Sequence, residues 1–526
     1  MPTAATNPDP DGSSPTRPVA APANGGNGIL IALSICTLLV HFLTNWRYGY
    51  FGDELYFIAC GDHLAWGYVD QPPLIAFIAR LTRILLGDSV FAIHFFPGVA
   101  HAVLVFMTGW TARQLGGDRF AQLLAGVSAL VGTGFLFTGT VLTMNAFEPL
   151  LWLLGADVVI LVLQGRSPKL WTLFGVVVGI GLLNKHSMLI FGFSIGVGLL
   201  LSARRQFSNR WIWVGALIAL LIFLPNLVWE VQNGWVTLDA MRQSKELNRL
   251  PFRLADFAFG NVMMTGPLLA PIAIAGLVFY FSRFGRDYRV LGISFVVTVA
   301  VVVLSEGKVY YALPAYPALL AGGSAMIGKL AEMRRWSWQK PVTISLLVAS
   351  GIALAPGALP VLSPESLVRY QNLIRFRGLK FEKVDEGEIP SYLASMIGWE
   401  NLVQTVARAY LALPPDQRAR TAILANNYAE AGAIDLLGPK LGLPGAISGH
   451  ESYALWGPGD RSGELVIAVG VPAQVMGRYY EEVELAGVAH AKYAQPHENE
   501  VPVLLCRRPR EGRTLREIWP EFRRFH

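Results

Sequence analysis

Long apolar segments recur along the first two thirds of the chain, and short polar stretches separate them. Runs of about 17 to 23 apolar residues are long enough to cross a bilayer as helices. About eleven such runs are present by this criterion, centred near residues 37, 101, 128, 152, 177, 195, 220, 271, 296, 319 and 349. Only Asn184-Lys185-His186-Ser187 separates the runs near 177 and 195. One re-entrant element would fit this spacing, but a tight turn between two spans is simpler. The pattern predicts a polytopic α-helical membrane protein over residues 28–359.

Basic residues fall in alternate loops between these predicted spans. Loops rich in lysine and arginine remain on the cytoplasmic side of a membrane. The loops with this excess lie near residues 113–119, 166–169, 204–210, 283–289 and 329–335. With an odd number of spans, the first long loop, residues 47–89, and everything after about residue 360 face outward. We therefore expect a multi-pass inner (plasma) membrane protein with its polar loops on the extracytoplasmic side.

The two ends of the chain differ from the spans in composition. Residues 1–27 are rich in Pro, Gly, Ala, Asn and Ser, which predicts a disordered cytoplasmic tail. The first apolar run starts only at Ile29, which argues against a cleavable signal peptide. Residues 360–526 alternate charged and apolar side chains, with strand patterns at 421–425, 464–469 and 501–505 and helical patterns at 391–413 and 426–437. These patterns predict a small extracytoplasmic α/β domain.

Composition agrees with a membrane protein and limits its chemistry. Of 526 residues, 53% are hydrophobic and only 15% are charged, and the mean hydropathy is +0.42. The loop asymmetry explains the net charge of +6, so no nucleic-acid partner is needed to account for it. The chain has no Walker loop, dinucleotide fingerprint or zinc-ligand cluster. Cys60 and Cys506 would both lie outside, where they could pair, although unlinked thiols are the simpler interpretation.

An acidic pair, Asp53-Glu54, lies just after the point where the first span should leave the lipid. Carboxylates are costly near a bilayer, so a pair placed there indicates a functional site. The same loop continues through Tyr56 and closes on Asp70-Gln71-Pro72-Pro73. Its interleaved aromatic, acidic and amide side chains suit a sugar or a polar headgroup. An ordinary solvated acidic loop is the alternative.

Two further polar clusters lie at the outer ends of predicted spans. Asn145 and Glu148 are three residues apart and therefore share one helix face, beside the helix-loosening Pro149. Glu148 could instead simply extend to the interface. Lys185, followed by His186, occupies a tight outer turn against the positive-inside trend, which indicates that it meets an anion.

The last cluster joins two outer loops. The longer loop ends near Arg253, and the next one carries Lys308 beside Tyr310 and Tyr311. Cationic groups with aromatic hydroxyls at headgroup depth are what a lipid-linked phosphate requires. Ordinary anchoring of Lys and Tyr at the interface is the alternative.

Seven strings distributed over residues 28–526 resemble one known group. They are GDELYFIACGDHLAWGYVDQPPL, TMNAFEPLLW, LLNKHSML, PNLVWEVQNGWVTL, GKVYYALPAYPALLAGG, ILANNYAEAGAIDLLG and SGHESYALWGPG. Together they resemble the GT-C membrane glycosyltransferases of the family 39 type. That group includes protein O-mannosyltransferases and, more distantly, the transferase that adds aminoarabinose to lipid A.

The resemblance implies transfer of a sugar from a polyprenyl-phosphate carrier to a protein, glycolipid or cell-envelope polysaccharide, with inversion at the anomeric carbon. It implies that Asp53 is the general base and that Glu54 orients the donor or acceptor. The cations for the leaving phosphate would be Lys185, Arg253 and Lys308, with Tyr310 or Tyr311. The substrate-binding residues would be Tyr56, Asp70, Gln71, Asn145, Glu148, Lys185, His186, Arg253, Lys308, Tyr310 and Tyr311. No cofactor is required, although some relatives bind a divalent metal near the residues that match Asp53 and Glu54.

This chain departs from the family pattern at three positions. Many relatives have a basic residue where Gln71 stands, an aspartate where Asn145 stands and an arginine where His94 stands. Phosphate and acceptor contacts are therefore expected to be redistributed.

Two other classes of function remain open at this stage. A transporter or flippase of lipid-linked sugars would place ionisable groups near the bilayer midplane and show repeated halves. Here these groups gather at one face. A non-catalytic scaffold would tolerate the loss of Asp53.

Overall fold

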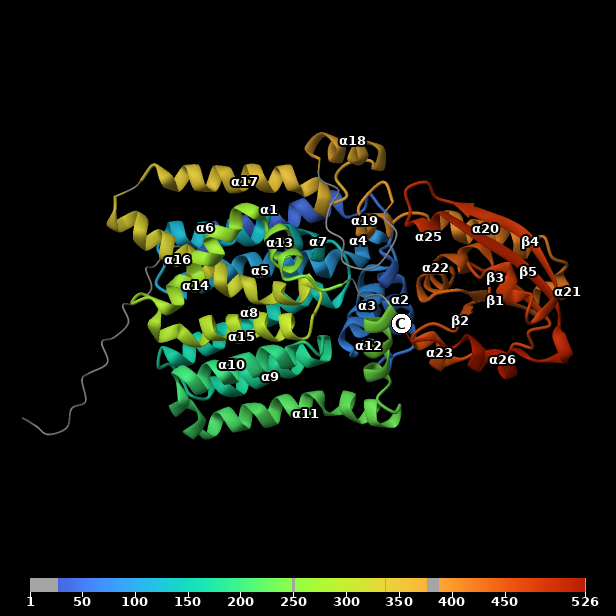
Figure 1. Cartoon of the computed structure of the whole chain (residues 1–526), viewed down its shortest axis with the longest axis horizontal. Coiled ribbons are helices and arrows are strands. Elements are labelled where there is room, and N and C mark those ends of the chain that lie inside the picture. The colour runs from blue at the N-terminus through green and yellow to red at the C-terminus, as the bar shows by residue number, and fades with distance from the viewer. Residues whose placement is uncertain (1–26, 248–250, 336, 376–386, 526) are drawn as a thin grey trace, which may run out of the picture.

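A computed structural model describes residues 27–247, 251–335, 337–375 and 387–525, and the statements below concern these residues. The tail predicted to be disordered lies outside them, except for Asn27. Figure 1 shows a bundle of long helices with an α/β domain at one end, and short helices between the two.

Every predicted span centre falls within a helix of the bundle. The bundle helices are α1 (Asn27–Thr44), α5 (Phe95–Gln114), α6 (Arg119–Val131), α7 (Thr133–Thr138), α8 (Met144–Leu163), α9 (Leu170–Asn184), α10 (Met188–Ser202), α11 (Arg210–Gln232), α13 (Leu254–Thr265), α14 (Ala270–Phe281), α15 (Arg289–Leu304), α16 (Tyr316–Met333) and α17 (Gln339–Ala358). The connections include the 3₁₀ helices η1 (Arg204–Ser208), η2 (Pro267–Leu269), η3 (Arg286–Tyr288) and η4 (Val309–Ala315).

By length and composition, six helical stretches in the described part of the chain can cross a membrane. They are Asn27–Thr44, Val90–Gln114, Met144–Leu163, Arg210–Gln232, Arg286–Leu304 and Gln339–Ala358. A seventh span is possible if α13 and the segment Pro267–Phe281, bent by 95°, form one broken span, and α6, α9 and α10 are shorter apolar helices. The chain is thus a polytopic helical membrane protein, and the count of eleven spans stays a prediction.

Small residues bring helices of the bundle into close contact. A Cβ atom on Gly175 of α9 would lie 2.0 Å from the carbonyl oxygen of Gly215 in α11. A Cβ atom on Gly323 of α16 would lie 1.9 Å from the carbonyl oxygen of Ile272 in α14. Close backbone approach of this kind is the usual basis of helix packing in lipid.

The first outer loop and part of the longer one form helices between the bundle and the α/β domain (Figure 1). They are α2 (Gly52–Asp62), α3 (Leu74–Leu86), α4 (Val90–Ile93) and α12 (Val236–Leu247). After α17, the short helices α18 (Pro364–Ile374) and α19 (Ser391–Ala394) lead into the C-terminal domain.

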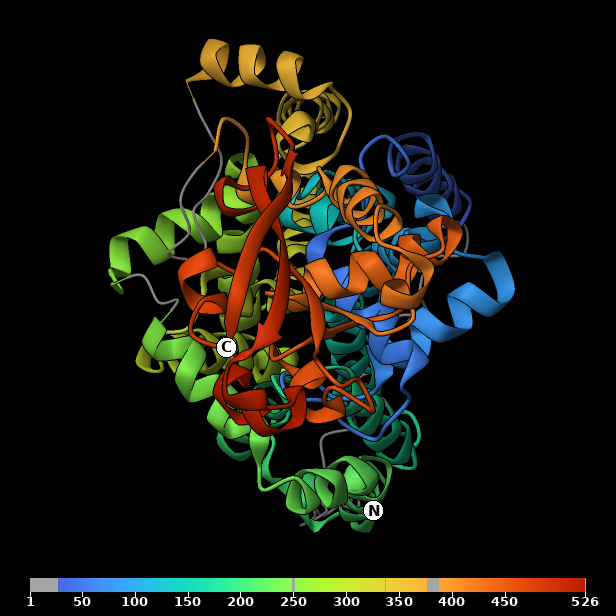
Figure 2. The same cartoon turned by 90° about the vertical axis from the view of Figure 1, so that its right-hand side faces the viewer.

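The C-terminal domain contains a five-stranded mixed sheet, which faces the viewer in Figure 2. Its strand order is β2-β1-β3-β5-β4; β1 is parallel to β2 and β3, whereas β5 is antiparallel to β3 and β4. The strands are β1 (Thr421–Ala425), β2 (Ala446–Ser448), β3 (Leu465–Val469), β4 (Tyr480–His490) and β5 (Glu500–Pro509). The helices are α20 (Trp399–Leu411), α21 (Pro415–Arg418), α22 (Tyr428–Leu437), α23 (Ser452–Trp456), α24 (Ala473–Met476), α25 (Pro496–Asn499) and α26 (Leu515–Phe522), with η5 (Gly438–Leu441) and η6 (Arg510–Gly512).

The α/β domain docks on α2. Leu55 and Ile58 of α2 belong to the same buried apolar cluster as Ile434 of α22 and Ile467 of β3. A Cβ atom on Gly432 of α22 would lie 2.5 Å from the carbonyl oxygen of Leu55. The helix that carries the acidic pair is therefore part of the core of the C-terminal domain.

Cys60 and Cys506 are both buried free thiols. They belong to separate apolar clusters, so the structure contains no disulfide between them.

A candidate active site between the bundle and the C-terminal domain

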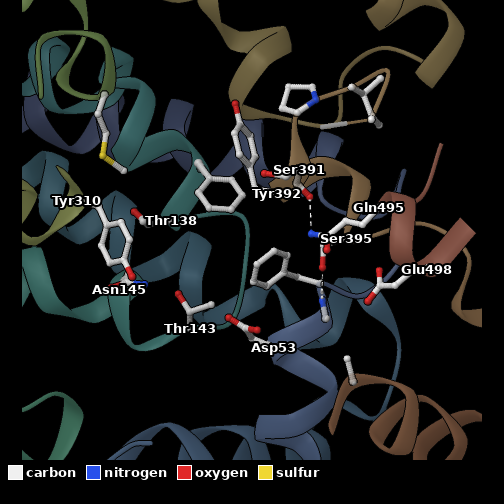
Figure 3. A pocket seen from close by; sticks show the side chains of 18 of the residues that line it. Asp53, Thr138, Thr143, Asn145, Tyr310, Ser391, Tyr392, Ser395, Gln495 and Glu498 are labelled. Atoms are coloured by element: carbon white, nitrogen blue, oxygen red, sulfur yellow. Dashed lines mark hydrogen bonds between the residues drawn. The ribbon is translucent and has the colours of Figure 1, made fainter. Parts of the chain in front are cut away.

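A cavity of about 400 Å³ opens where the bundle, α2 and the C-terminal domain meet. Figure 3 shows Asp53 between two sets of lining side chains, with Tyr310 and Asn145 on one side and Glu498, Gln495 and Ser395 on the other. The polar residues that line the cavity are Asp53, Thr138, Thr143, Asn145, Glu148, Tyr310, Glu388, Ser391, Tyr392, Ser395, Asn427, Tyr428, His450, Gln495, His497 and Glu498.

Asp53 lies in the first turn of α2, where the unpaired N–H groups of the helix favour a negative charge. The Tyr428 hydroxyl donates a hydrogen bond to Asp53 Oδ1 over 2.9 Å. The Tyr428 ring packs against Tyr56 and stacks on His450, with centroid distances of 4.8 Å to both. Burial, and then the charge of Asp53, raise the pKa of Tyr428, so its hydroxyl remains a proton donor. The half-buried Asp53 carboxylate is thus held by a residue of the C-terminal domain while it lines the cavity.

Glu54 has a different position from the one expected for a substrate-orienting group. Its side chain is fully buried. Oε2 accepts a hydrogen bond from the Phe51 amide over 2.8 Å and lies 2.9 Å from His94 Nε2, while Oε1 accepts one from the Leu142 amide. Both carboxylate oxygens are engaged and Glu54 does not line the cavity. The expectation of direct substrate contact is therefore corrected: Glu54 holds the start of α2 against the bundle.

A second carboxylate, Asp70, does not line the cavity but interacts electrostatically with Asp53. The Tyr56 hydroxyl donates to Asp70 Oδ1 over 2.9 Å and lies 2.7 Å from Ser452 Oγ. Desolvation by the surrounding protein, and then the charge of Asp53, raise the pKa of Asp70. The hydrogen bond from Tyr56 lowers it. Burial raises the pKa of the neighbouring Glu451 in the same way, with Asp70 and Asp53 adding to it. Proximity disfavours the simultaneous ionisation of these acids.

Two of the three predicted cations, Lys185 and Lys308, form a cationic cluster beside Tyr310, which lines the cavity. Lys185 Nζ donates to Asn145 Oδ1 over 2.7 Å and lies 3.0 Å from Glu148 Oε2. The same ammonium lies 5.4 Å from the ring centroid of Tyr310 and 5.1 Å from that of Tyr311. The anion that Lys185 meets within the protein is thus Glu148. Lys308 Nζ lies 5.9 Å from the Tyr310 ring centroid and belongs to this cluster.

Of the eleven residues expected to bind substrate, Asn145, Glu148 and Tyr310 line the cavity, whereas Tyr56, Asp70, Gln71, Lys185, His186, Arg253, Lys308 and Tyr311 do not. His186, Gln71 and Arg253 are three of these eight. His186 Nε2 lies 3.1 Å from Asn226 Oδ1, which connects the turn after α9 to α11. Gln71 is fully buried, and its amide nitrogen approaches Cys60 Sγ at 3.7 Å. Arg253 is exposed at the start of α13. None of the three lines the cavity, so this geometry does not support direct substrate contact for them.

Sequence reasoning missed the residues that the C-terminal domain contributes. Tyr428, His450, Gln495 and Glu498 line the cavity but were not among the predicted site residues. Tyr428 and His450 lie in two of the strings that carried the resemblance, which was the available signal. Gln495 and Glu498 precede β5 and carried no such signal.

The carboxylate oxygens of the acidic pair are not arranged to bind one metal ion. Glu54 has both oxygens engaged, so Asp53 and Glu54 do not present two carboxylates to one ion. The described ranges also contain no group of three His, Cys, Asp or Glu side chains arranged to bind a metal.

Comparisons with known proteins agree with this architecture. Residues 70–229 match the family described as dolichyl-phosphate-mannose-protein mannosyltransferase. A curated relative, the lipid A galacturonosyltransferase RgtD of Rhizobium johnstonii, is 23% identical over 65% of this chain and 72% of that protein. The crystal structure of ArnT from Cupriavidus metallidurans in the apo state has a TM-score of 0.61 at 14% identity, covering 91% of this chain and 98% of that one. The same protein bound to undecaprenyl phosphate has a TM-score of 0.58, also at 14% identity and with the same coverage of both chains.

The bundle with its attached domain defines a polytopic membrane protein whose fold is that of ArnT. The family match over residues 70–229 and the curated relative are both to membrane sugar transferases, and they agree with the GT-C glycosyltransferase resemblance of the sequence strings. The resemblance noted from the sequence strings is confirmed, and the transporter and scaffold alternatives receive no support from these matches.

Proposed function

We propose that this enzyme transfers a sugar from a polyprenyl-phosphate-linked donor to a hydroxyl acceptor on the outer face of the membrane, with inversion. One observation carries the proposal: Asp53 lines the same cavity as Asn145, Glu148 and Tyr310, which lie beside the Lys185 ammonium. A base and a cationic cluster at one cavity suit the displacement of a lipid phosphate from a sugar carbon. The lipid phosphates named for the matched family and for the bound ArnT structure support this donor class.

In this reaction Asp53 takes the proton from the acceptor hydroxyl. The acceptor oxygen then forms a bond to the anomeric carbon as the bond from that carbon to the phosphate oxygen breaks. The polyprenyl phosphate leaves with the electron pair. A single displacement inverts the anomeric carbon, and the balance of atoms and charge needs no cofactor.

The leaving phosphate carries growing negative charge, which preorganised cations stabilise. Lys185 is held in place by Asn145 and Glu148 and packs on the rings of Tyr310 and Tyr311. Lys308 adds a second cation near Tyr310. A donor phosphate would share Lys185 with Glu148, and the Asn145 amide keeps the ammonium in position.

The outer location follows from the loop charges and the supply of donor. Nucleotide sugars are not available outside the cell, whereas lipid-linked sugars are. Reporter fusions after residues 116, 245 and 400 are expected to read inside, outside and outside. A cytoplasmic signal at residue 400 would place the C-terminal domain, and Asp53 with it, on the wrong side.

The test of the reaction is Asp53→Asn. This change keeps the size of the side chain and removes its basicity, and loss of a general base typically lowers the rate ~100-fold to 10,000-fold. A deletion strain would be complemented with wild type or variant, and its envelope glycans and lipid-linked sugars measured by mass spectrometry. Wild type should restore the missing glycan, whereas Asp53→Asn should leave the lipid-linked donor to accumulate.

The matched control is Asp62→Asn. Asp62 is at the other end of α2, where it pairs with Arg80 and Arg83 and does not line the cavity. Full complementation by a well-folded Asp53→Asn variant would exclude Asp53 as the base.

A further inference from the structure

The side of the cavity opposite the cationic cluster is built by the C-terminal domain and the segment that leads into it. Gln495 and Glu498 come from the connection between β4 and β5, and Ser391 and Ser395 come from α19 and the residue after it (Figure 3). Asp53 lies between this side and Tyr310, as Figure 3 shows. If the donor phosphate occupies the Tyr310 side, the acceptor must reach Asp53 from the Glu498 side.

Glu498 has a carboxyl oxygen that lacks a partner within the described residues. Its side chain is 8% exposed, and Oε1 lies 3.7 Å from His497 Nε2. Oε2 is buried with no hydrogen-bond partner in that part of the chain. A buried polar atom left unpaired costs about 1–3 kcal/mol, so such atoms at a cavity wall are expected to be satisfied by what binds there. Burial, and then the charges of Glu430 and Asp53, raise the pKa of Glu498, which favours the neutral carboxyl group, a form that can both donate and accept a hydrogen bond.

The polar groups around Glu498 give this side a fixed shape. Gln495 Nε2 donates to the Ser391 carbonyl oxygen over 3.0 Å. The Ser395 hydroxyl oxygen accepts from the Gly52 amide over 3.2 Å, beside Asp53. Aromatic rings of Phe51, Tyr392 and Tyr428 also line the cavity. Alternating rings and hydrogen-bonding groups suit the faces and edges of a sugar ring better than an extended peptide.

The charge of the cavity wall indicates what that sugar can carry. Its acidic lining residues are Asp53, Glu148, Glu388 and Glu498, and no lysine or arginine is among the described residues that line it. Lys185 forms an ion pair with Glu148, and this pair lies on the donor side of the cavity. Within this described lining, an anionic substituent on the acceptor would meet carboxyl groups and no lysine or arginine.

We propose that this side of the cavity is the acceptor subsite and that Glu498 is its specificity-determining residue, taking a hydroxyl of an uncharged sugar ring rather than a phosphorylated ring or a peptide. This inference rests on the proposed function for its orientation toward Asp53. Its test is a binding measurement, so it can fail or succeed independently of the transfer reaction.

The experiment uses the full chain in nanodiscs saturated with undecaprenyl phosphate, which occupies the cationic cluster. N-acetylglucosamine, glucosamine 6-phosphate and a short serine-containing peptide serve as probes in saturation-transfer NMR. N-acetylglucosamine should bind, whereas the phosphorylated sugar and the peptide should bind at least about tenfold more weakly. A factor of ten corresponds to about 1.4 kcal/mol, the size of one lost hydrogen bond.

Variants then locate the binding on Glu498. Glu498→Leu should weaken N-acetylglucosamine binding about tenfold, since it removes one hydrogen bond. Glu498→Gln, which keeps both donor and acceptor, should stay close to wild type. Glu500→Leu is the control, because Glu500 is exposed and does not line the cavity. Thermal unfolding should show all three variants folded. Wild-type affinity in Glu498→Leu, or equal binding of the phosphorylated sugar or the peptide, would overturn the proposal.

Discussion

Tyr428→Phe tests whether the C-terminal domain takes part in catalysis. The change removes one hydroxyl, which donates to Asp53 Oδ1 over 2.9 Å, and leaves the ring between Tyr56 and His450. Hydrogen bonds to charged groups contribute about 1.5–3 kcal/mol. Because Asp53 is only half-buried, we take the lower end of this range. One pH unit corresponds to about 1.4 kcal/mol, so the expected effect is about one unit.

The sign of this effect follows from the role of Asp53. The hydrogen bond from Tyr428 favours the charged carboxylate, which is the form that accepts a proton. Without it, a higher pH is needed to ionise Asp53. The acid limb of the kcat/KM profile should therefore move upward by about one pH unit, with the plateau at higher pH changed less.

The assay measures transfer at saturating donor in purified protein across the acid limb. Tyr479→Phe is the matched control, since Tyr479 also donates to a carboxylate, Glu521, over 3.1 Å but lies at the surface of the same domain. A Tyr428→Phe profile that overlays wild type would mean that the hydroxyl does not act on the base. A general loss of activity at every pH would instead indicate a structural role only.

Two further changes test other parts of the site. Lys308→Ala should raise the KM for donor more than the KM for acceptor, because Lys308 lies beside Tyr310 on the phosphate side. Steady-state kinetics with each substrate varied in turn measure both values. A change in the KM for acceptor alone would contradict this prediction. Glu54→Gln should lower the thermal stability by about 1–3 kcal/mol, because Glu54 accepts from the amides of Phe51 and Leu142 and contacts His94, so an amide NH₂ leaves one buried donor unpaired. Thermal unfolding measures this effect against the exposed control Glu400→Gln, and equal melting temperatures would show that the network is dispensable.

The helices of the bundle were predictable because their signal is local. A helix that crosses a bilayer requires a long apolar run, which is visible in the sequence by itself. All eleven predicted centres fall within helices. The strands β1, β3 and β5 were visible for the same reason, as short runs of apolar, β-branched residues. The strands β2 and β4 were missed. β2 has only three residues, and β4 is largely exposed, so neither gives a clear apolar run.

Within the acidic pair, the sequence could not assign a direction to each carboxylate. Neighbouring residues on a helix point to different sides. Asp53 therefore faces the cavity while Glu54 faces the bundle, where His94 meets it. The sequence analysis singled out His94 only as a departure from the pattern that the resemblance implies, and this did not indicate that its partner would be Glu54.

The contribution of the C-terminal domain was hidden by distance along the chain. Tyr428 and Asp53 are 375 residues apart, and no periodicity links them. Their contact arises because α22 packs on α2, with Gly432 against the Leu55 backbone. The interface that docks the domain is thus the same one that delivers Tyr428 to the base. A substitution that loosens this interface should lower transfer without changing any residue that lines the cavity, and the domain therefore acts as a structural part of the active site.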